Sequence, residues 1–388
     1  MDTKDSNFNR PTVPEILYKN GKGTASDNVN DVRGDSQYGT RDDVIARSFY
    51  GINHRQQPLP VPINKDYFGL TFFTRPELNM STENLRTVRK FTPLLNKDDT
   101  SIQRIIRCTL DPRLANPING STPVTCPLID NKQAFIPFLT NNLLSVSGFP
   151  DVSVPTYTSE PGAYGEVYSM VDGITDIYSS YDITVALRNM PGDPITEFFY
   201  YWTAYTSAVL EGMMIPYPEK IIEREVDYQT RIYRVVLDHT KTYVKKIMCC
   251  AAAFPLNAPI GAAANYESSK PINDSNDQIS ISFRALGYFC YDNLIIKHFN
   301  ASVVQANPAM GDQSRNGVYR KIPTLALELF NTYGYPRIDP TTRELEWWIE
   351  KEIYESKTSY INSRKEILGV SDQSTTISAQ NTATQGFA

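Results

Sequence analysis

The feature of this sequence that most constrains its fold is one aromatic helix pattern set between clear strand patterns. Residues 183–188 and 278–285 alternate between apolar and polar side chains, which is the period of a half-buried strand. Between them, Asp193 is expected to cap a helix that Pro194 opens and Gly212 ends. The chain shows no repeated strand–helix–strand alternation. We therefore expect an α+β fold, in which an antiparallel β-barrel or β-sandwich carries a packed helix.

Apolar side chains of these two strands and of the helix form the expected barrel core. They are Ile183, Val185, Leu187, Phe198, Trp202, Ile279, Ile281 and Phe283. Strands rich in Tyr and Val are also predicted at 226–237 and 242–248. The expected organisation is an extended N-terminal arm (1–60), a mixed α+β accessory region (61–153), the barrel domain (154–301), a helical C-terminal region (302–370) and a flexible tail (371–388).

The arm is the first source of candidate subunit contacts. Residues 1–60 contain few apolar side chains and no sustained periodicity. They form either a disordered leader or an arm that orders against a neighbouring subunit. In the second case, the apolar segments 13–18 and 58–62 anchor the arm. Its candidate interface residues are Ile16, Leu17 and Tyr18.

The C-terminal region is the second source. Residues 341–368 carry apolar side chains at helical spacing, which predicts a long amphipathic helix. Trp347 and Trp348 lie near its start and are further candidate interface residues. A helix of this kind packs either on the core of its own domain or on a neighbouring subunit.

Shorter patterns occur in the accessory and C-terminal regions. Aromatic residues predict a strand at 67–73, and Ser81 is expected to cap a short helix that Pro93 closes. A further helix is predicted at 322–330, opened by Pro323.

The composition argues against several classes of protein. The 388 residues include 38 Lys and Arg against 43 Asp and Glu, a net charge of −5, whereas nucleic-acid-binding domains rely on basic surfaces. No apolar run approaches the ~20 residues of a membrane-spanning helix. The N-terminal residues lack the pattern of a secretory signal, so we expect no secretion.

Motifs for catalysis or cofactor binding are also missing from the sequence. It has three histidines, no nucleotide-binding or hydrolase motif, and five cysteines without metal-binding spacing, which are interpreted as buried thiols. We therefore expect no catalytic residue, no cofactor and no metal. An enzyme that uses unrecognised Asp/Glu residues with a recruited metal is the alternative from another class, and a deep pocket of converging carboxylates would support it.

Three segments resemble the tail-tube proteins of contractile-tailed bacteriophages and related injection machines. The first is the strand end at 187–193, which leads into the aromatic helix. The second is a strand pair that leads to 253–260 (Ala-Phe-Pro-Leu-Asn-Ala-Pro-Ile). The third is Asn265-Tyr266-Glu267, followed by a final strand at 277–285. Together these segments cover about a third of the chain.

The resemblance implies a tail-tube-like β-barrel whose copies, usually six per ring, stack into a tube. It implies a structural virion protein of the tail or neck, assembled in the host cytoplasm and without enzymatic activity. The expected partners are copies of the same chain, other tail or neck proteins, and viral DNA that passes through the lumen without sequence-specific binding. The negative net charge agrees with a channel that does not hold DNA.

The chain is longer than ordinary tube subunits, which puts polymerisation as the main tube in doubt. The arm, the accessory region and the C-terminal region are typical of a specialised ring, such as a tube initiator at the baseplate, a tube terminator, or a neck or collar component. A connector that does not form the tube and a receptor- or sugar-binding virion module are the remaining structural alternatives.

Overall fold

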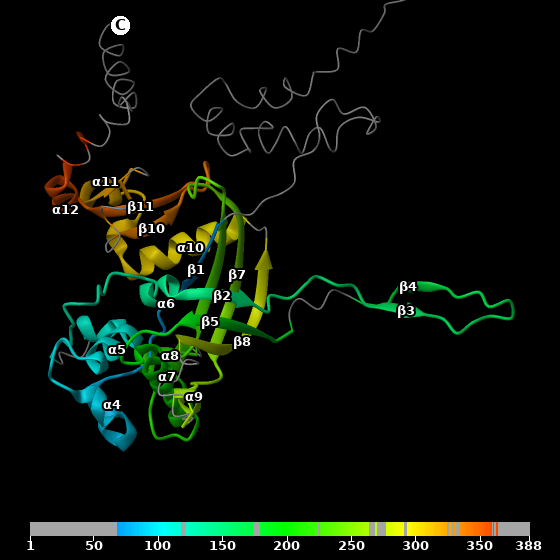
Figure 1. Ribbon diagram of the computed structural model, residues 1–388, viewed down its shortest axis with the longest axis horizontal. Helices are drawn as coiled ribbons and strands as arrows, with labels where there is room; N and C mark the ends of the chain where they lie inside the picture. Colours follow the sequence, from blue (N-terminus) through cyan, green and yellow to red (C-terminus); the bar gives the residue numbers. More distant parts are fainter. Residues whose placement is uncertain are drawn as a thin grey trace, which may run out of the picture.

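The computed structural model describes residues 68–117, 122–173, 179–223, 226–263, 268–269, 277–290, 293–323, 326–327, 330, 334–358, 360 and 362–363 (Figure 1). The predicted arm with Ile16, Leu17 and Tyr18, the predicted tail at 371–388 and the Asn265-Tyr266-Glu267 motif lie outside the described residues.

A six-stranded antiparallel sheet forms the centre of the molecule, with the strand order β1-β6-β7-β8-β5-β2 (Figure 1). The strands are β1 (Phe68–Phe73), β2 (Leu143–Ser147), β5 (Tyr181–Arg188), β6 (Thr230–Leu237), β7 (Val244–Pro255) and β8 (Gln278–Cys290). The strands predicted at 183–188, 226–237, 242–248 and 278–285 all belong to this sheet. Its two outer strands, β1 and β2, come from the region expected to be accessory.

The segment before β2 brings the two ends of the sheet close to each other, so that the sheet is nearly closed. The backbone N–H of Ile136 donates to Phe73 O of β1 at 2.9 Å, and Thr140 Oγ1 donates to Thr71 O at 2.8 Å. This segment includes α6 (Pro137–Asn141), after which the chain enters β2 and pairs with β5. The result is the expected barrel-like α+β architecture.

The long helix α7 (Pro194–Leu210) packs on one face of the sheet. All eight residues of the predicted core are at most 4% exposed. Trp202 stacks on Phe199, with 6.0 Å between the ring centroids, and meets Phe283 of β8 edge to face at 6.4 Å. The opposite face, over β1, β6 and β7, is covered by α10 (Asn293–Ala306), whose Phe299 stacks on Phe135 with 4.9 Å between the centroids.

The two ends of α7 show which local signals were correct. Pro194 is the first helical residue, as predicted. Asp193 occupies the N-cap position, but its carboxylate accepts from the Asn189 amide and makes no capping bond, because the residue has a left-handed backbone with φ of 52°. At the other end, Gly212 has φ of 71°, and Met213 N–H donates to Ala208 O at 2.9 Å in a Schellman arrangement.

The accessory region contains short helices, which are α4 (Thr82–Thr87), α5 (Ile102–Leu110) and the 3₁₀ helices η2 (Arg89–Leu95) and η3 (Pro112–Ala115). Ser81 caps α4 as predicted, since its Oγ accepts from Asn84 N–H at 3.4 Å. Pro93 does not close this helix but lies inside η2, where a 3₁₀ turn accommodates it. The remaining short helices are α8 (Pro218–Glu223), α9 (Ile260–Ala263), η5 (Pro308–Met310) and α11 (Arg315–Val318).

The C-terminal region corrects the prediction of a long helix over 341–368. Leu345–Glu350 instead form strand β11, which pairs with β10 (Tyr335–Ile338) and β9 (Tyr319–Lys321), and α12 is short (Lys351–Ser356). Leu345, Trp348 and Ile349 fit a helical spacing, whereas Leu345, Trp347 and Ile349 fit the alternation of a strand, so periodicity could not separate the two. A strand is favoured because β9 and β10 pair with this segment on its two sides and because its aromatic side chains suit a pleated surface.

Among the described residues, no helix has the length and apolar character needed to cross a membrane.

Candidate assembly surfaces

The two outer strands of the sheet are its first candidate contact surfaces. β1 is bridged on its outer side at Thr74, which pairs with Phe135, but its N-terminal half extends beyond this bridge. β2 pairs with β5 alone among the described strands. Strand edges of this kind present N–H and C=O groups that another chain can pair with.

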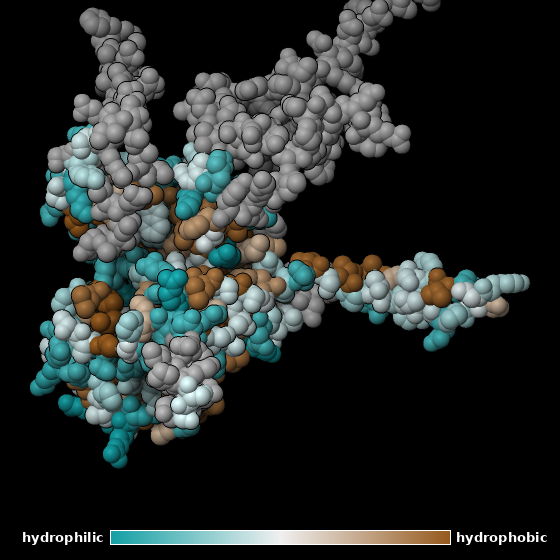
Figure 2. All heavy atoms as spheres, in the orientation of Figure 1, coloured by the Kyte–Doolittle hydropathy of each residue, from teal (hydrophilic) through white to brown (hydrophobic). Residues whose placement is uncertain are grey.

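A long hairpin that projects from the body is the second candidate surface (Figure 1). It contains β3 (Thr156–Thr158) and β4 (Ser169–Val171), and every residue of both strands is exposed. Tyr164 near its tip is 97% exposed and Tyr168 is 67% exposed. Figure 2 shows apolar side chains along this projection. Because an isolated two-stranded hairpin is at best marginally stable, this segment is suited to contact with another chain.

Sequence reasoning missed this hairpin, although a signal was present. Gly165 has φ of 75° at the turn, and the strands on either side contain Thr, Tyr and Val. A glycine-containing connection between two such segments indicates a hairpin.

The face of β5 and β8 that points away from α7 is polar. Across the two strands, Asp182 faces Arg284, Thr184 faces Ser282 and Ala186 faces Ser280. Arg284 Nη1 lies 2.9 Å and 3.0 Å from the two carboxylate oxygens of Asp182, which neutralises both charges. Arg188, which is exposed, faces Gln278 at the end of the same face. This hydroxyl-rich surface is called the β5–β8 face below.

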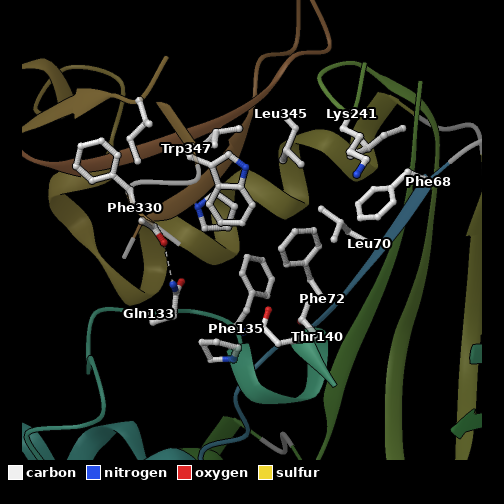
Figure 3. Close-up of a pocket in the computed structure, with 17 residues that line it drawn as sticks. Phe68, Leu70, Phe72, Gln133, Phe135, Thr140, Lys241, Phe330, Leu345 and Trp347 are labelled. Carbon is white, nitrogen blue, oxygen red and sulfur yellow. Dashed lines mark hydrogen bonds between the residues drawn. The ribbon is translucent and has the colours of Figure 1, made fainter. Parts of the chain in front are cut away.

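A largely apolar pocket of about 420 Å³ lies between β1 and β11 (Figure 3). Its walls include Phe68, Leu70 and Phe72 of β1 and Trp347 of β11. Lys241 stands at one side, with Nζ 4.6 Å from the centre of the Phe68 ring. Its size is within the range of ordinary ligand pockets, so it can accept several apolar side chains.

The two candidate tryptophans therefore have different environments. Trp347 is half-buried and lines the pocket. Trp348 is 8% exposed and donates from Nε1 to Glu346 Oε2 at 3.0 Å, while the Arg315 guanidinium lies 4.6 Å above its ring. Glu346 also accepts from Arg337 at 3.1 Å. Trp348 is thus engaged within its own domain, whereas Trp347 has a face open to the pocket.

A buried polar network connects the accessory region to the loop after α7. Asp111 accepts from Met80 N–H at 2.9 Å and from the Tyr217 hydroxyl at 2.7 Å, and Tyr205 donates to Asp227 at 2.5 Å. Burial raises the pKa of Asp111 to about 6 and also raises the pKa of Asp227. These residues are widely separated in sequence, and no motif identifies them.

A second cavity of about 930 Å³ is lined by polar residues that include Glu77, Arg113 and Asp227. Glu77 Oε2 lies 2.7 Å from Arg113 Nη2 and 3.2 Å from Lys220 Nζ, so cations already engage this carboxylate. The cavity therefore does not present the free converging carboxylates that an acid–base or metal site needs. Within the described residues, no group of His, Cys, Asp and Glu is arranged to hold a metal ion.

The cysteines are reduced and mostly buried. Cys108, Cys126, Cys249 and Cys250 are buried and Cys290 is partly buried. Burial raises the pKa of Cys108 to about 11 and that of Cys249 to about 12, which disfavours the nucleophilic thiolate.

Solved structures to which the chain is similar in part belong to contractile injection systems. The sheath/tube terminator of the extracellular PVC system in its extended state is 16% identical, with a TM-score of 0.23, over 41% of this chain and 88% of that chain. The tube-terminating cap of the anti-feeding prophage is 17% identical, with a TM-score of 0.25, over 45% and 97%. A PVC sheath–tube complex chain is 18% identical, with a TM-score of 0.23, over 40% and 82%.

No curated protein matches the chain. The sequence profile of the family described as "Putative phage tail tube protein" matches residues 8–365, which is most of the chain and includes the whole described sheet. The chain therefore belongs to this family of phage tail tube proteins.

Proposed function

We propose that this chain is a subunit of a closed ring in a phage tail, and that its barrels form part of the DNA-delivery channel. The observation that carries the proposal is the nearly closed sheet with the outer edges of β1 and β2 at its margins. Such edges are sites of aggregation unless another chain covers them. When the outer edge of β2 meets a different surface of an identical neighbour, the contact is heterologous and generates a ring if the rotation closes.

The β5–β8 face is the proposed channel lining. Its Asp182–Arg284 pair is neutralised, and Thr184 and Ser282 contribute uncharged hydroxyl groups. DNA binding depends mainly on Lys and Arg contacts with phosphates. A surface with few cations, of which Arg188 at the end of β5 is one, holds DNA weakly.

The ring is proposed to be hexameric, as the tail-tube resemblance implies, with the projecting hairpin in contact with a neighbouring copy, and to contact other tail or neck proteins. Its proposed location is the virion, after assembly in the host cytoplasm. The proposed role is structural and non-enzymatic, with no cofactor.

The ring is tested by light scattering after gel filtration and by negative-stain electron microscopy of the purified full-length protein. We expect ring-shaped particles with six-fold symmetry. A protein that remains monomeric at millimolar concentration would contradict the proposal.

The channel lining is tested by the double variant Thr184→Lys and Ser282→Lys. In a hexamer it adds twelve positive charges to the lumen, so we expect salt-sensitive DNA retention that the parent protein lacks. The matched control places lysines at Leu210 and Ile222, which are exposed and lie outside this face. Equal DNA retention by both variants would show that the β5–β8 face does not line the channel.

A specialised end ring is the second candidate, and one observation favours it. The turn between β6 and β7 is covered by the chain's own C-terminal region, where Leu345 N–H donates to Thr242 O and Val244 N–H donates to Arg343 O, both at 2.8 Å. A ring in the middle of a tube needs two complementary stacking ends, and here one end of the strands is occupied. We expect single rings or ring pairs from purified protein. Long tubes would instead favour the main tube.

A further inference from the structure

The pocket between β1 and β11 has features of a binding site for an extended polypeptide. Apolar residues form most of its wall, and the aromatic or large ones include Phe68, Leu70, Phe72, Phe135, Phe330 and Trp347. Figure 3 shows Trp347 and Phe330 from the C-terminal region on one side and the β1 side chains on the other. Exposed apolar surface of this kind marks a site of interaction with another chain, so we expect the pocket to be filled in the assembled protein.

The outer edge of β1 adjoins this pocket. Thr74 N–H donates to Arg231 on the β6 side, while Phe73 O and Thr71 O accept bonds on the outer side. Because backbone groups of successive residues point to opposite edges, the N–H and C=O of Gly69 also point outward. This position lies beyond the segment at 134–140 that covers the rest of the edge. An incoming strand can pair there.

Two polar groups of the pocket specify what the occupant must carry. Gln133 donates from Nε2 to Gly334 O at 3.0 Å, and its Oε1 is buried with no hydrogen-bond donor in the part of the chain that the structure describes. A buried acceptor without a donor is costly, so the occupant should supply an N–H or O–H. Lys241 is the one charged side chain among the described wall residues, and it favours an acidic group nearby.

We propose that this pocket binds residues 13–18 (Val-Pro-Glu-Ile-Leu-Tyr) of a second copy of this chain. Ile16, Leu17 and Tyr18 supply apolar side chains and a hydroxyl, and Glu15 supplies the carboxylate for Lys241. The inference rests on the proposed ring, in which copies stand side by side. It joins the candidate arm residues to Trp347, which lines their binding site.

Chain length separates this segment from the other apolar segment of the arm. Residues 58–62 contain Pro58, Pro60 and Pro62, which have no N–H to donate to a strand edge. They also end six residues before Phe68, a tether of about 20 Å that keeps them on their own subunit. Tyr18 is fifty residues from Phe68, and this length spans up to about 160 Å, enough to reach a neighbour.

The first experiment measures binding of a fluorescent peptide of residues 11–20. The receptor is the full-length chain with Ile16→Ser, Leu17→Ser and Tyr18→Ser, so that its own arm does not compete. We expect saturable binding, and at least about a hundredfold loss when the peptide carries the same three serines. Equal binding of the two peptides would overturn the proposal.

A charge exchange tests the position of the peptide. Lys241→Glu in the receptor should weaken binding about fivefold, and Glu15→Lys in the peptide should restore it. Lys241 is exposed, so the fold does not depend on it. If Glu15→Lys weakens binding equally to both receptors, Glu15 does not meet Lys241 and the proposed placement is wrong.

Photo-crosslinking identifies the copy that supplies the segment. With p-benzoylphenylalanine in place of Tyr18, we expect covalent dimers whose crosslinked peptides contain Phe68 or Trp347. Crosslinks within one chain, or dimers linked elsewhere, would overturn the proposal. Ring formation is scored separately by electron microscopy, so failure of the proposed ring can be told apart from failure of the proposed peptide site. Rings that form while the peptide does not bind refute only the peptide site.

Discussion

Truncation of Trp202 is the sharpest test of the packing of α7 on the sheet. The indole is fully buried, contacts the rings of Phe198, Phe199 and Phe283, and donates from Nε1 to Tyr228 O at 3.0 Å. Trp202→Ala removes these contacts and leaves a cavity, which costs about 3–5 kcal/mol. The carbonyl of Tyr228 also loses its donor, which adds about 1 kcal/mol. We expect a total loss of about 5 kcal/mol.

The assay is urea and thermal unfolding followed by far-UV circular dichroism, at a concentration where the protein is monomeric. For a body of about 300 residues, a loss of 5 kcal/mol lowers the melting temperature by roughly 8 °C. Trp202→Phe keeps an aromatic ring and should cost about 2 kcal/mol. Tyr164→Ala, at an exposed aromatic of the hairpin, should change stability by less than about 0.5 kcal/mol. If Trp202→Ala lies within about 1 kcal/mol of the parent, the described core packing is wrong.

Three further predictions concern the polar network, the C-terminal sheet and the hairpin. The raised pKa of Asp111 means that the folded state binds the proton of this carboxyl more tightly than the unfolded state does. The resulting contribution to the free energy of unfolding, on the order of 3 kcal/mol, is present below about pH 4 and is lost as the pH rises through about 6. Asp111→Asn should remove this pH dependence of the free energy of unfolding, measured by urea titrations from pH 4 to 7. If the free energies of the parent and the variant differ by the same amount at every pH, the prediction is contradicted. Glu346→Ala leaves Trp348 Nε1 without its acceptor and removes one of two carboxylate partners from half-buried Arg337, so it should destabilise by about 2 kcal/mol in thermal melts. Exposed Glu352→Ala should have little effect, and similar melting of both variants would refute the role of Glu346. Tyr164→Ser with Tyr168→Ser should leave monomer stability unchanged but reduce particle formation in negative-stain images, and undiminished assembly would exclude the hairpin as a contact.

Local sequence signals predicted the elements whose determinants lie within a few residues. The alternation at 183–188 and 278–285 defines strands whose inward residues are also inward in the fold, because the period of two assigns each side chain to one face. Pro194 and Gly212 correctly mark the ends of α7, since each meets a backbone requirement of the helix terminus itself. The tail-tube resemblance rested on the same segments.

Signals that depend on distant partners were ambiguous or invisible. Apolar spacing around Trp348 fits a helix and a strand equally, and only the pairing with β9 and β10 selects the strand. The network of Asp111 and Tyr217 joins residues more than a hundred positions apart, so no local pattern contains it.

The sequence by itself therefore determined β5 and β8, the central helix and the side of each that faces the core, since these follow from short-range periodicity and backbone preference. Only the tertiary structure decided that β1 and β2 complete the sheet, that residues 134–140 bring its ends together, and that Trp347 opens onto a pocket beside β1. The physical reason is that strand pairing and pocket formation are set by contacts between distant segments, whose energies depend on the whole packed arrangement.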